Sequence, residues 1–154
     1  MRIRRAEPCD AEAVSDVLIA SIIGLCGADH GGIPANIKRW TANKAPGTVE
    51  EWIKDPASTL LVAEEDGEIV CVGAFRGAEI LLNYVRPAAR FSGASKAMLA
   101  HMEREMRKQG IVEARLTSTA TAHRFYRSAG WTYEGEQAKA IDGPQALPMS
   151  KRLS

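Results

Sequence analysis

Apolar residues along this chain recur at two different spacings, and the change between them separates predicted helices from predicted strands. One run of apolar positions spaced by three or four residues contains Val14, Val17, Leu18, Ile22 and Leu25. It predicts a helix over residues 10–26, with Asp10 as the N-cap. A proline is expected to open a second helix over residues 34–43. Thr48 and Glu51 have capping-box spacing, which predicts a short third helix.

Strands are predicted at residues 2–5 and then as three consecutive segments, 59–64, 68–75 and 79–85. The dipeptide Asp66-Gly67 lies between the first two of these segments. Such a pair is typical of a tight hairpin turn, which needs positive φ angles. A second glycine-containing turn leads into the third segment. The three segments are therefore expected to form an antiparallel meander.

The helical spacing returns after residue 92 and predicts a helix over residues 93–109. Its apolar face contains Ala94, Ala97, Met98, Met102 and Met106. The elements predicted beyond it are a strand (111–118), a helix (121–129), a strand (131–136) and, after a turn at Asp142-Gly143, a last strand (148–153). Strands 79–85 and 111–118 flank one helix, so they should be parallel. The predicted fold class is an α/β mixed sheet, in which an antiparallel N-terminal meander adjoins a central parallel pair.

Length and composition are those of one globular domain over residues 1–154. The chain is 45% hydrophobic and 25% charged. Its cysteines, Cys9, Cys26 and Cys71, have neither CxxC spacing nor a nearby pair of histidines, so we expect no disulfide framework and no metal. The longest apolar run is too short to cross a membrane, and the N-terminus lacks the apolar stretch of a signal peptide. A cytoplasmic protein is expected.

The net charge of +1 conceals an uneven distribution. Residues 1–85 carry 8 basic and 13 acidic side chains, whereas residues 86–131 carry 9 and 3. Solvated faces alone can produce such runs, but the basic segment could also meet a polyanion and the acidic one a cation. The basic segment lacks the interleaved aromatic residues of a single-strand platform, so nucleic acid is not an expected partner.

The turn between the third meander strand and the long helix carries the clearest chemistry. It reads VRPAARFSGASKAML, with Gly93 and the small residues Ala94 and Ser95 at the start of the helix. A glycine turn at a helix N-terminus exposes backbone N–H groups, to which the helix dipole adds positive potential. Arg90 and Lys96 add mobile positive charge. The combination is typical of a phosphate-binding turn, and it matches neither a Walker A motif nor a dinucleotide fingerprint.

This turn resembles the acetyl-CoA loop of the GCN5-related N-acetyltransferase (GNAT) superfamily. Four residues match that loop: Val85, Pro87, Arg90 and Gly93. Ser95 replaces the usual glycine or alanine, and Phe91 stands where a glycine is common. A second block, LTSTATAHRFYRSAGW, matches the family at Ala122, Phe125, Tyr126, Gly130 and Trp131. Both blocks and the predicted elements follow the family's order over nearly the whole chain.

The resemblance implies acetyl-CoA as the co-substrate, with its pantetheine arm between two splayed strands, 79–85 and 111–118. A primary amine would then attack the thioester directly, without a covalent enzyme intermediate. Backbone N–H groups near Asn83 would polarise the thioester oxygen. The residues expected to bind the cofactor are Val85, Arg90, Phe91, Ser92, Gly93, Ala94, Ser95, Lys96, Thr119 and Tyr126.

Tyr126 is the leading catalytic residue, because the family's tyrosine at this position donates a proton to the leaving thiolate. The family's base is often a glutamate on the strand before the loop, which makes Glu79 a candidate, or else a chain of water molecules. Alternation places Glu79 and Asn83 on one face of that strand, together with Val85. Asp29 and His30 lie in a glycine-rich segment, residues 27–34, where the family often builds its amine site and where a mobile lid is expected.

The expected acceptor is therefore an amine on a small molecule or a peptide. The acidic N-terminal half favours a cationic acceptor, such as a polyamine, an aminoglycoside or a lysine side chain. Dimers are common in the family, which makes a homodimer one expected assembly. A second class of function stays open: a module of the same fold that binds acyl-CoA and senses or regulates without turnover, and that would need neither Tyr126 nor a base.

Overall fold

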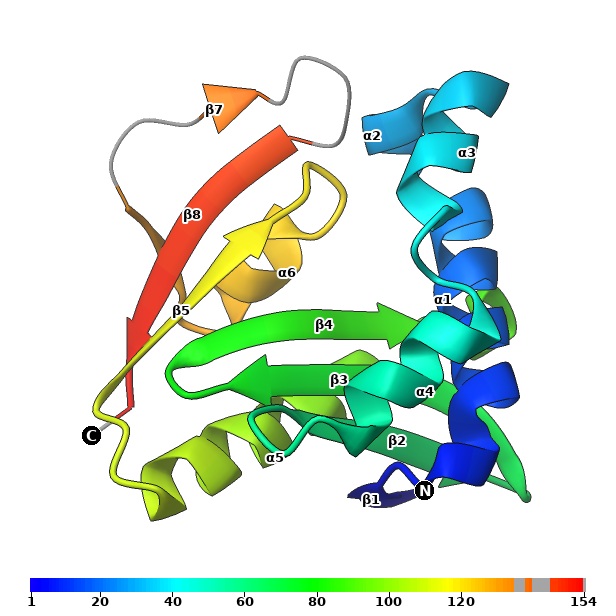
Figure 1. The fold of residues 1–154 in the computed structure, drawn as a ribbon. Helices are drawn as coiled ribbons and strands as arrows, with labels where there is room; N and C mark the ends of the chain where they lie inside the picture. Colours follow the sequence, from blue (N-terminus) through cyan, green and yellow to red (C-terminus); the bar gives the residue numbers. More distant parts are fainter. Residues whose placement is uncertain (135–137, 140–144, 154) are drawn as a thin grey trace.

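The computed structural model describes residues 1–134, 138–139 and 145–153. Its strands are β1 (Arg2–Arg5), β2 (Thr59–Glu65), β3 (Glu68–Arg76), β4 (Glu79–Val85), β5 (Glu113–Ser118), β6 (Thr132–Tyr133), β7 (Ala138–Lys139) and β8 (Gln145–Arg152). They form one mixed sheet in the order β1-β2-β3-β4-β5-β8-β6, and β7 pairs with β8 off this path. Helices cover both faces of the sheet (Figure 1).

The helices are α1 (Ala11–Leu25), α2 (Gly27–His30), α3 (Pro34–Thr41), α4 (Pro46–Lys54), α5 (Ala94–Lys108) and α6 (His123–Ser128). Two short 3₁₀ turns, η1 (Pro8–Asp10) and η2 (Pro87–Ala89), precede α1 and α5. Helix α5 packs on one face of the sheet, and α1 and α4 pack on the other. None of the described helices combines the length and apolarity that a bilayer crossing requires.

The predicted meander and the predicted parallel pair are both confirmed. β2, β3 and β4 pair antiparallel in sequence, and the hairpin at Asp66-Gly67 has the expected positive φ angles of 52° and 81°. β4 pairs parallel with β5 through the crossover helix α5. The last strand, β8, inserts antiparallel between β5 and β6 and is longer than predicted. The predicted turn at Asp142-Gly143 lies outside the described residues.

Two helix starts differ from the prediction. Asp10 is the N-cap residue of α1, as predicted, but its side chain makes no capping bond, because its carboxylate accepts hydrogen bonds from the Arg4 guanidinium at 2.7 and 3.0 Å and from the Glu7 amide at 2.7 Å. These bonds lower the pKa of Asp10. The predicted capping box at Thr48 lies inside α4, since Pro46 starts the helix two residues earlier with its fixed φ angle. The predicted strand 131–136 is only Thr132–Tyr133 among the described residues.

The core on the α5 face depends on a methionine stripe. Met98, Met102 and Met106 are fully buried, as the periodicity predicted, and each such burial stabilises the fold by about 1.5–3 kcal/mol. Gly73 of β3 lets α5 approach the sheet this closely. A Cβ atom at that position would lie 2.6 Å from Cγ and 2.7 Å from Sδ of Met98. The contact is far below normal van der Waals separation, so the sequence needs glycine here.

A buried carboxylate on α5 forms an ion pair with strand β8, in the second half of the sheet. Glu103 of α5 is 4% exposed and pairs with Lys151 of β8 at 2.6 Å. The same lysine donates to the Ala129 carbonyl oxygen at 2.8 Å, just after α6. Because both charges are paired and hydrogen-bonded, burial of the carboxylate is tolerated. The network holds α5, α6 and β8 together around the second half of the sheet.

We predict that Gly73→Ala lowers the free energy of unfolding by about 1–3 kcal/mol, because the added methyl group overpacks the Met98 contact. Gly47→Ala is the matched control. Gly47 lies in α4 with open space around it, so alanine there should raise stability by about 0.5–1 kcal/mol. Urea denaturation measures both. A Gly73→Ala protein as stable as the wild type would contradict the packing role.

Candidate active site between strands β4 and β5

The parallel pairing of β4 with β5 is short, and a cavity opens where it stops. The register pairs Glu79 with Arg115 and Ile80 with Leu116, and no later pair joins the two described strands. Beyond Ile80 they diverge, as Figure 1 shows for the green β4 and the yellow β5. The gap holds a cavity of about 480 Å³ with largely apolar walls. The predicted splaying of this strand pair is thus confirmed.

Residues from α1, β4, β5, the turn before α5 and the start of α6 line the cavity. The sequence-predicted residues among them are Asn83, Val85, Arg90, Phe91, Gly93, Ala94, Ser95, Lys96, Thr119 and Tyr126. Ser92 does not line it, because its hydroxyl turns back and donates to the Ala89 carbonyl oxygen at 2.5 Å. The Thr119 hydroxyl accepts from the Ala122 amide at 3.3 Å, so it also helps to start α6.

A β-bulge in β4 decides which of its side chains reach the site. Phe75 pairs with Ile80 and Ala74 with Leu82, so Leu81 is the extra residue in β4. The bulge breaks the alternation on which the Glu79 prediction depended. Asn83 faces α5. Glu79 lies at the exposed start of the strand, where its backbone is in register with Arg76 of β3. Its side chain is on the other face of the strand and does not line the cavity. The predicted shared face of Glu79 and Asn83 is therefore wrong.

The N-terminus of α5 opens directly onto the cavity. Gly93 is the N-cap with a φ angle of 86°, a left-handed conformation that favours glycine. No side chain of the described residues caps this helix, so its first-turn amides stay available to an anion. Arg90 and Lys96 also line the cavity and add positive charge. This end of the cavity is chemically suited to a phosphate.

Tyr126 contributes a buried hydroxyl to the wall opposite β4. The residue is 7% exposed, and its ring makes edge contacts with Phe125 at 5.2 Å and Trp131 at 6.0 Å between centroids. Burial raises the pKa of Tyr126, and the nearby Tyr84 raises it further, while a hydrogen bond with Asn83 opposes the shift. The hydroxyl is therefore protonated at neutral pH, and it can donate a hydrogen bond to an anion that develops in the cavity.

Asn83 connects three parts of the site. Its amide nitrogen donates to the Ser95 carbonyl oxygen at 3.3 Å, in the first turn of α5. Its side-chain oxygen accepts from the Cys71 thiol of β3 at 3.8 Å. Burial raises the pKa of the Cys71 thiol to about 12, so the thiol stays neutral and can donate. Asn83 thus links β4 to β3 and to the first turn of α5.

Two site residues, Tyr84 and Cys26, were missed as such in the sequence. Tyr84 lies on the β4 face opposite to Asn83, and burial raises the pKa of its hydroxyl while a hydrogen bond with Trp40 opposes the shift. Burial raises the pKa of the Cys26 thiol to about 12, which makes it a poor nucleophile at neutral pH. The sequence did contain one signal for Tyr84 as a site residue: a tyrosine next to Asn83 in a strand that is otherwise largely apolar.

Asp29 and His30 do not form the predicted mobile loop. Their segment is a one-turn helix, α2, and Asp29 accepts hydrogen bonds across the molecule from Ala120 N at 2.8 Å, Thr121 N at 3.0 Å and Thr121 Oγ1 at 2.5 Å. His30 is buried, with Nε2 bonded to the Ile22 carbonyl oxygen at 2.7 Å and Nδ1 accepting from the Gly32 amide at 2.9 Å. Neither residue lines the cavity, and both hold α2 in place.

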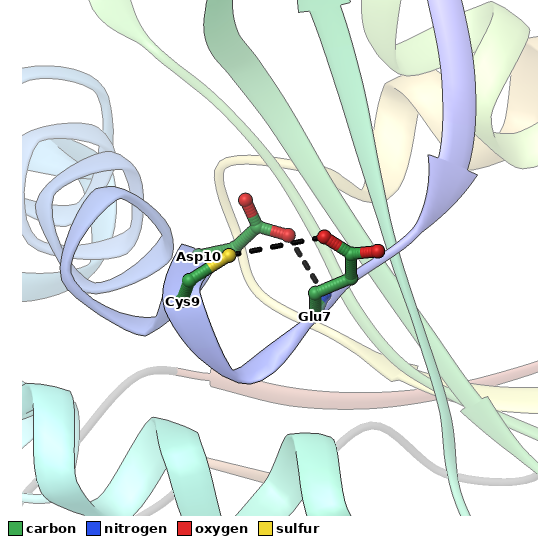
Figure 2. A group of neighbouring side chains, drawn as sticks. All are labelled: Glu7, Cys9 and Asp10. Carbon is green, nitrogen blue, oxygen red and sulfur yellow. Dashed lines mark hydrogen bonds between the residues drawn. The ribbon is translucent and has the colours of Figure 1, made fainter.

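A second cluster of potential ligands lies away from the cavity, where β1 leads into α1. Figure 2 shows Glu7, Cys9 and Asp10 grouped there, with ligand atoms within 4.8 Å of one another. Both oxygens of Asp10 are already bonded to Arg4, which also pairs with Glu64 at 2.7 Å. These contacts neutralise the carboxylate, and the cluster is explained as the junction that fixes the start of α1.

Comparison with known proteins supports the fold that the sequence resemblance implies. Residues 28–153 match the family model described as an acetyltransferase (GNAT) domain. No curated protein matches the chain. The chain is similar to a GCN5-related N-acetyltransferase from Rhodopseudomonas palustris, with a TM-score of 0.86 and 17% identity over 98% of this chain and 94% of that one.

Two further solved structures were compared. The PaiA N-acetyltransferase from Thermoplasma acidophilum, in complex with coenzyme A, has a TM-score of 0.81 and 21% identity over 98% of each chain. The ribosomal-protein-S18-alanine N-acetyltransferase from Escherichia coli has a TM-score of 0.70 and 17% identity over 99% of this chain and 94% of that one. At these identities the likeness shows the fold alone.

We predict that Asp29→Ala lowers the free energy of unfolding by about 1–3 kcal/mol, because three donors lose their acceptor. Asp16→Ala, at an exposed position of α1, should change stability by less than about 0.5 kcal/mol. Denaturant unfolding of both variants provides the measurement. Equal stability of Asp29→Ala and the wild type would show that these bonds do not hold α2.

Proposed function

Since the chain belongs to the acetyltransferase (GNAT) family, we propose that it transfers the acetyl group of acetyl-CoA to a primary amine on a small molecule or a peptide. One observation carries the proposal. The uncapped N-terminus of α5 and the buried hydroxyl of Tyr126 line one cavity between diverging strands. The first suits the phosphates of a nucleotide and the second suits a leaving thiolate.

The cofactor would bind along the cavity in two parts. Its pyrophosphate accepts hydrogen bonds from the first-turn amides of α5, with Arg90 and Lys96 supplying countercharge. Its pantetheine arm occupies the gap beyond Ile80, where β4 no longer pairs with β5 and its backbone groups face the cavity instead. Amide groups of the arm can then bond those backbone groups in place of the missing strand.

The reaction needs few protein groups. The amine nitrogen attacks the thioester carbonyl carbon, the new C–N bond forms, and the C–S bond breaks. The Tyr126 hydroxyl gives its proton to the sulfur, the amine releases a proton to solvent, and the Tyr126 oxygen regains a proton from solvent. Glu79 lies outside the cavity, so it does not accept that proton directly. Most of the rate enhancement would come from holding amine and thioester together, which can supply roughly 7–11 kcal/mol.

The cavity walls also bear on the acceptor. Leu25, Leu81 and Leu82 add apolar surface to the cavity, together with Cys26 and Tyr84. Apolar walls favour an amine carried on an apolar group, because its burial is stabilising. Asp29, the anion expected to bind a cationic acceptor, is already bonded to residues 120 and 121.

The protein would act in the cytoplasm without a metal, a nucleic acid or a membrane, and a homodimer stays a prediction.

We predict that the protein binds acetyl-CoA and that a screen of primary amines finds one that releases free thiol from it. Gly93→Val should abolish or strongly weaken binding, because valine is strained at the positive φ angle and its side chain blocks approach to the α5 amides. Calorimetry with acetyl-CoA and a thiol-release assay are the two measurements.

Gly67→Val is the matched control for Gly93→Val. Gly67 has a φ angle of 81° and equally open surroundings, but it lies in the β2–β3 hairpin. The Gly67→Val protein should therefore lose about as much stability as the Gly93→Val protein, but it should keep its affinity for acetyl-CoA. Unchanged affinity in folded Gly93→Val would exclude this turn as the phosphate site. Binding without turnover of any amine would favour a sensor over an enzyme.

We predict that Tyr126→Phe lowers kcat by up to about 10²–10⁴-fold and changes acetyl-CoA affinity little, because the hydroxyl acts when charge develops on sulfur. Tyr133→Phe removes a hydroxyl that bonds His123 outside the cavity lining, so its kcat should match the wild type. Steady-state kinetics separate the two variants. Equal kcat values for Tyr126→Phe and the wild type would reduce Tyr126 to a packing role.

A further inference from the structure

Phe91 has an unusual environment for an aromatic residue. It lies in the turn between η2 and α5, and its side chain is 92% exposed while still contributing to the cavity lining. Exposed at this level, the ring gains almost nothing from the hydrophobic effect in the folded chain. The ring is thus presented to whatever enters the cavity from solvent.

The backbone at this position also disfavours an aromatic residue. Phe91 has a φ angle of 66°, and the only other described non-glycine residue with a positive φ angle is Asp66 of the hairpin turn. A bulky side chain is rarely found in this left-handed conformation, which glycine adopts without penalty. Folding alone therefore offers no reason for phenylalanine at residue 91.

One face of the ring already has a flat, charged partner. The Arg90 guanidinium lies over the Phe91 ring at 4.4 Å from its centroid. This cation–π contact orients the ring, and the high exposure leaves the remainder of its surface open to a second planar group. Arg90 and Phe91 together form a small platform just before Gly93, the N-cap of α5.

We infer that this platform stacks against the adenine base of acetyl-CoA, an inference that rests on the proposed function. If the pyrophosphate binds the α5 amides, the pantetheine arm extends into the cavity and the adenosine must extend outward from the same turn. Phe91 lies in that turn and is open to solvent. A purine offers a flat π surface of matching size, and stacking on an aromatic side chain is an established way to hold a base.

The test compares acetyl-CoA with S-acetyl-4′-phosphopantetheine, which lacks the adenosine. Phe91→Gly should weaken acetyl-CoA binding by about 5- to 100-fold, the range expected for loss of one stacked base. Its affinity for the truncated thioester should equal that of the wild type. Phe91→Tyr should keep full affinity for acetyl-CoA. Because the ring is not buried, none of these changes removes core packing.

Two controls make the result specific. Val112→Gly removes another exposed apolar side chain, one outside the cavity lining, and should change neither affinity. Acetyl-dephospho-CoA should show the same loss with Phe91→Gly, because the base and not the 3′-phosphate makes the contact. Calorimetry provides all the dissociation constants.

The outcomes separate this inference from the proposed function. Equal losses for acetyl-CoA and the truncated thioester would mean that Phe91 shapes the turn, and would overturn the stacking. No loss for acetyl-CoA, or a loss confined to ligands with the 3′-phosphate, would overturn it as well. A wild-type protein that binds none of the three ligands would overturn the proposed function and the stacking with it.

Discussion

The site depends on the way in which β4 diverges from β5 while it stays paired with β3. One extra residue, Leu81, interrupts the pairing with β3, and the ladder to β5 ends one residue earlier at Ile80. A bulge increases local twist and bends the strand, so the two parallel strands can diverge without breaking the rest of the sheet. The same residue turns Asn83 toward α5 and leaves Glu79 on the opposite face. That single insertion therefore lies where the cavity opens and decides which β4 side chains face it.

An open gap in a sheet needs support on both sides. Helix α5 packs its methionines against β3 at Gly73, and Glu103 ties that helix to Lys151 of β8. Across the gap, Asp29 joins α2 to the start of the α6 segment. These contacts come from both halves of the sheet, so the diverging strands are held apart by packed cores and hydrogen bonds. A cavity built on such fixed elements is preorganised for a ligand.

The two ends of the cavity have different electrostatics, and each suits one part of a thioester cofactor. The α5 end offers uncapped amides and mobile cations to phosphate oxygens. Tyr126 is buried, which raises the pKa of its hydroxyl and keeps that hydroxyl uncharged at neutral pH. Burial likewise keeps the thiols of Cys26 and Cys71 neutral, so they do not compete as nucleophiles. The proposed reaction would then draw on positioning and on one hydroxyl, that of Tyr126.

The sequence by itself determined the meander, the crossover helix and the glycine turn, because these depend on local periodicity and turn conformation. Tyr126 was singled out only through the resemblance of its segment to the family's motif. It could not show that Leu81 is a bulge, since alternation continues through an apolar run whether or not a partner strand skips a residue. Nor could it show that the oxygens of Asp10 and Asp29 bond to Arg4 and to residues 120–121, because those partners come together only in the folded chain. Tertiary packing decided these features, since it alone fixes which distant groups meet each carboxylate and where a strand loses its register.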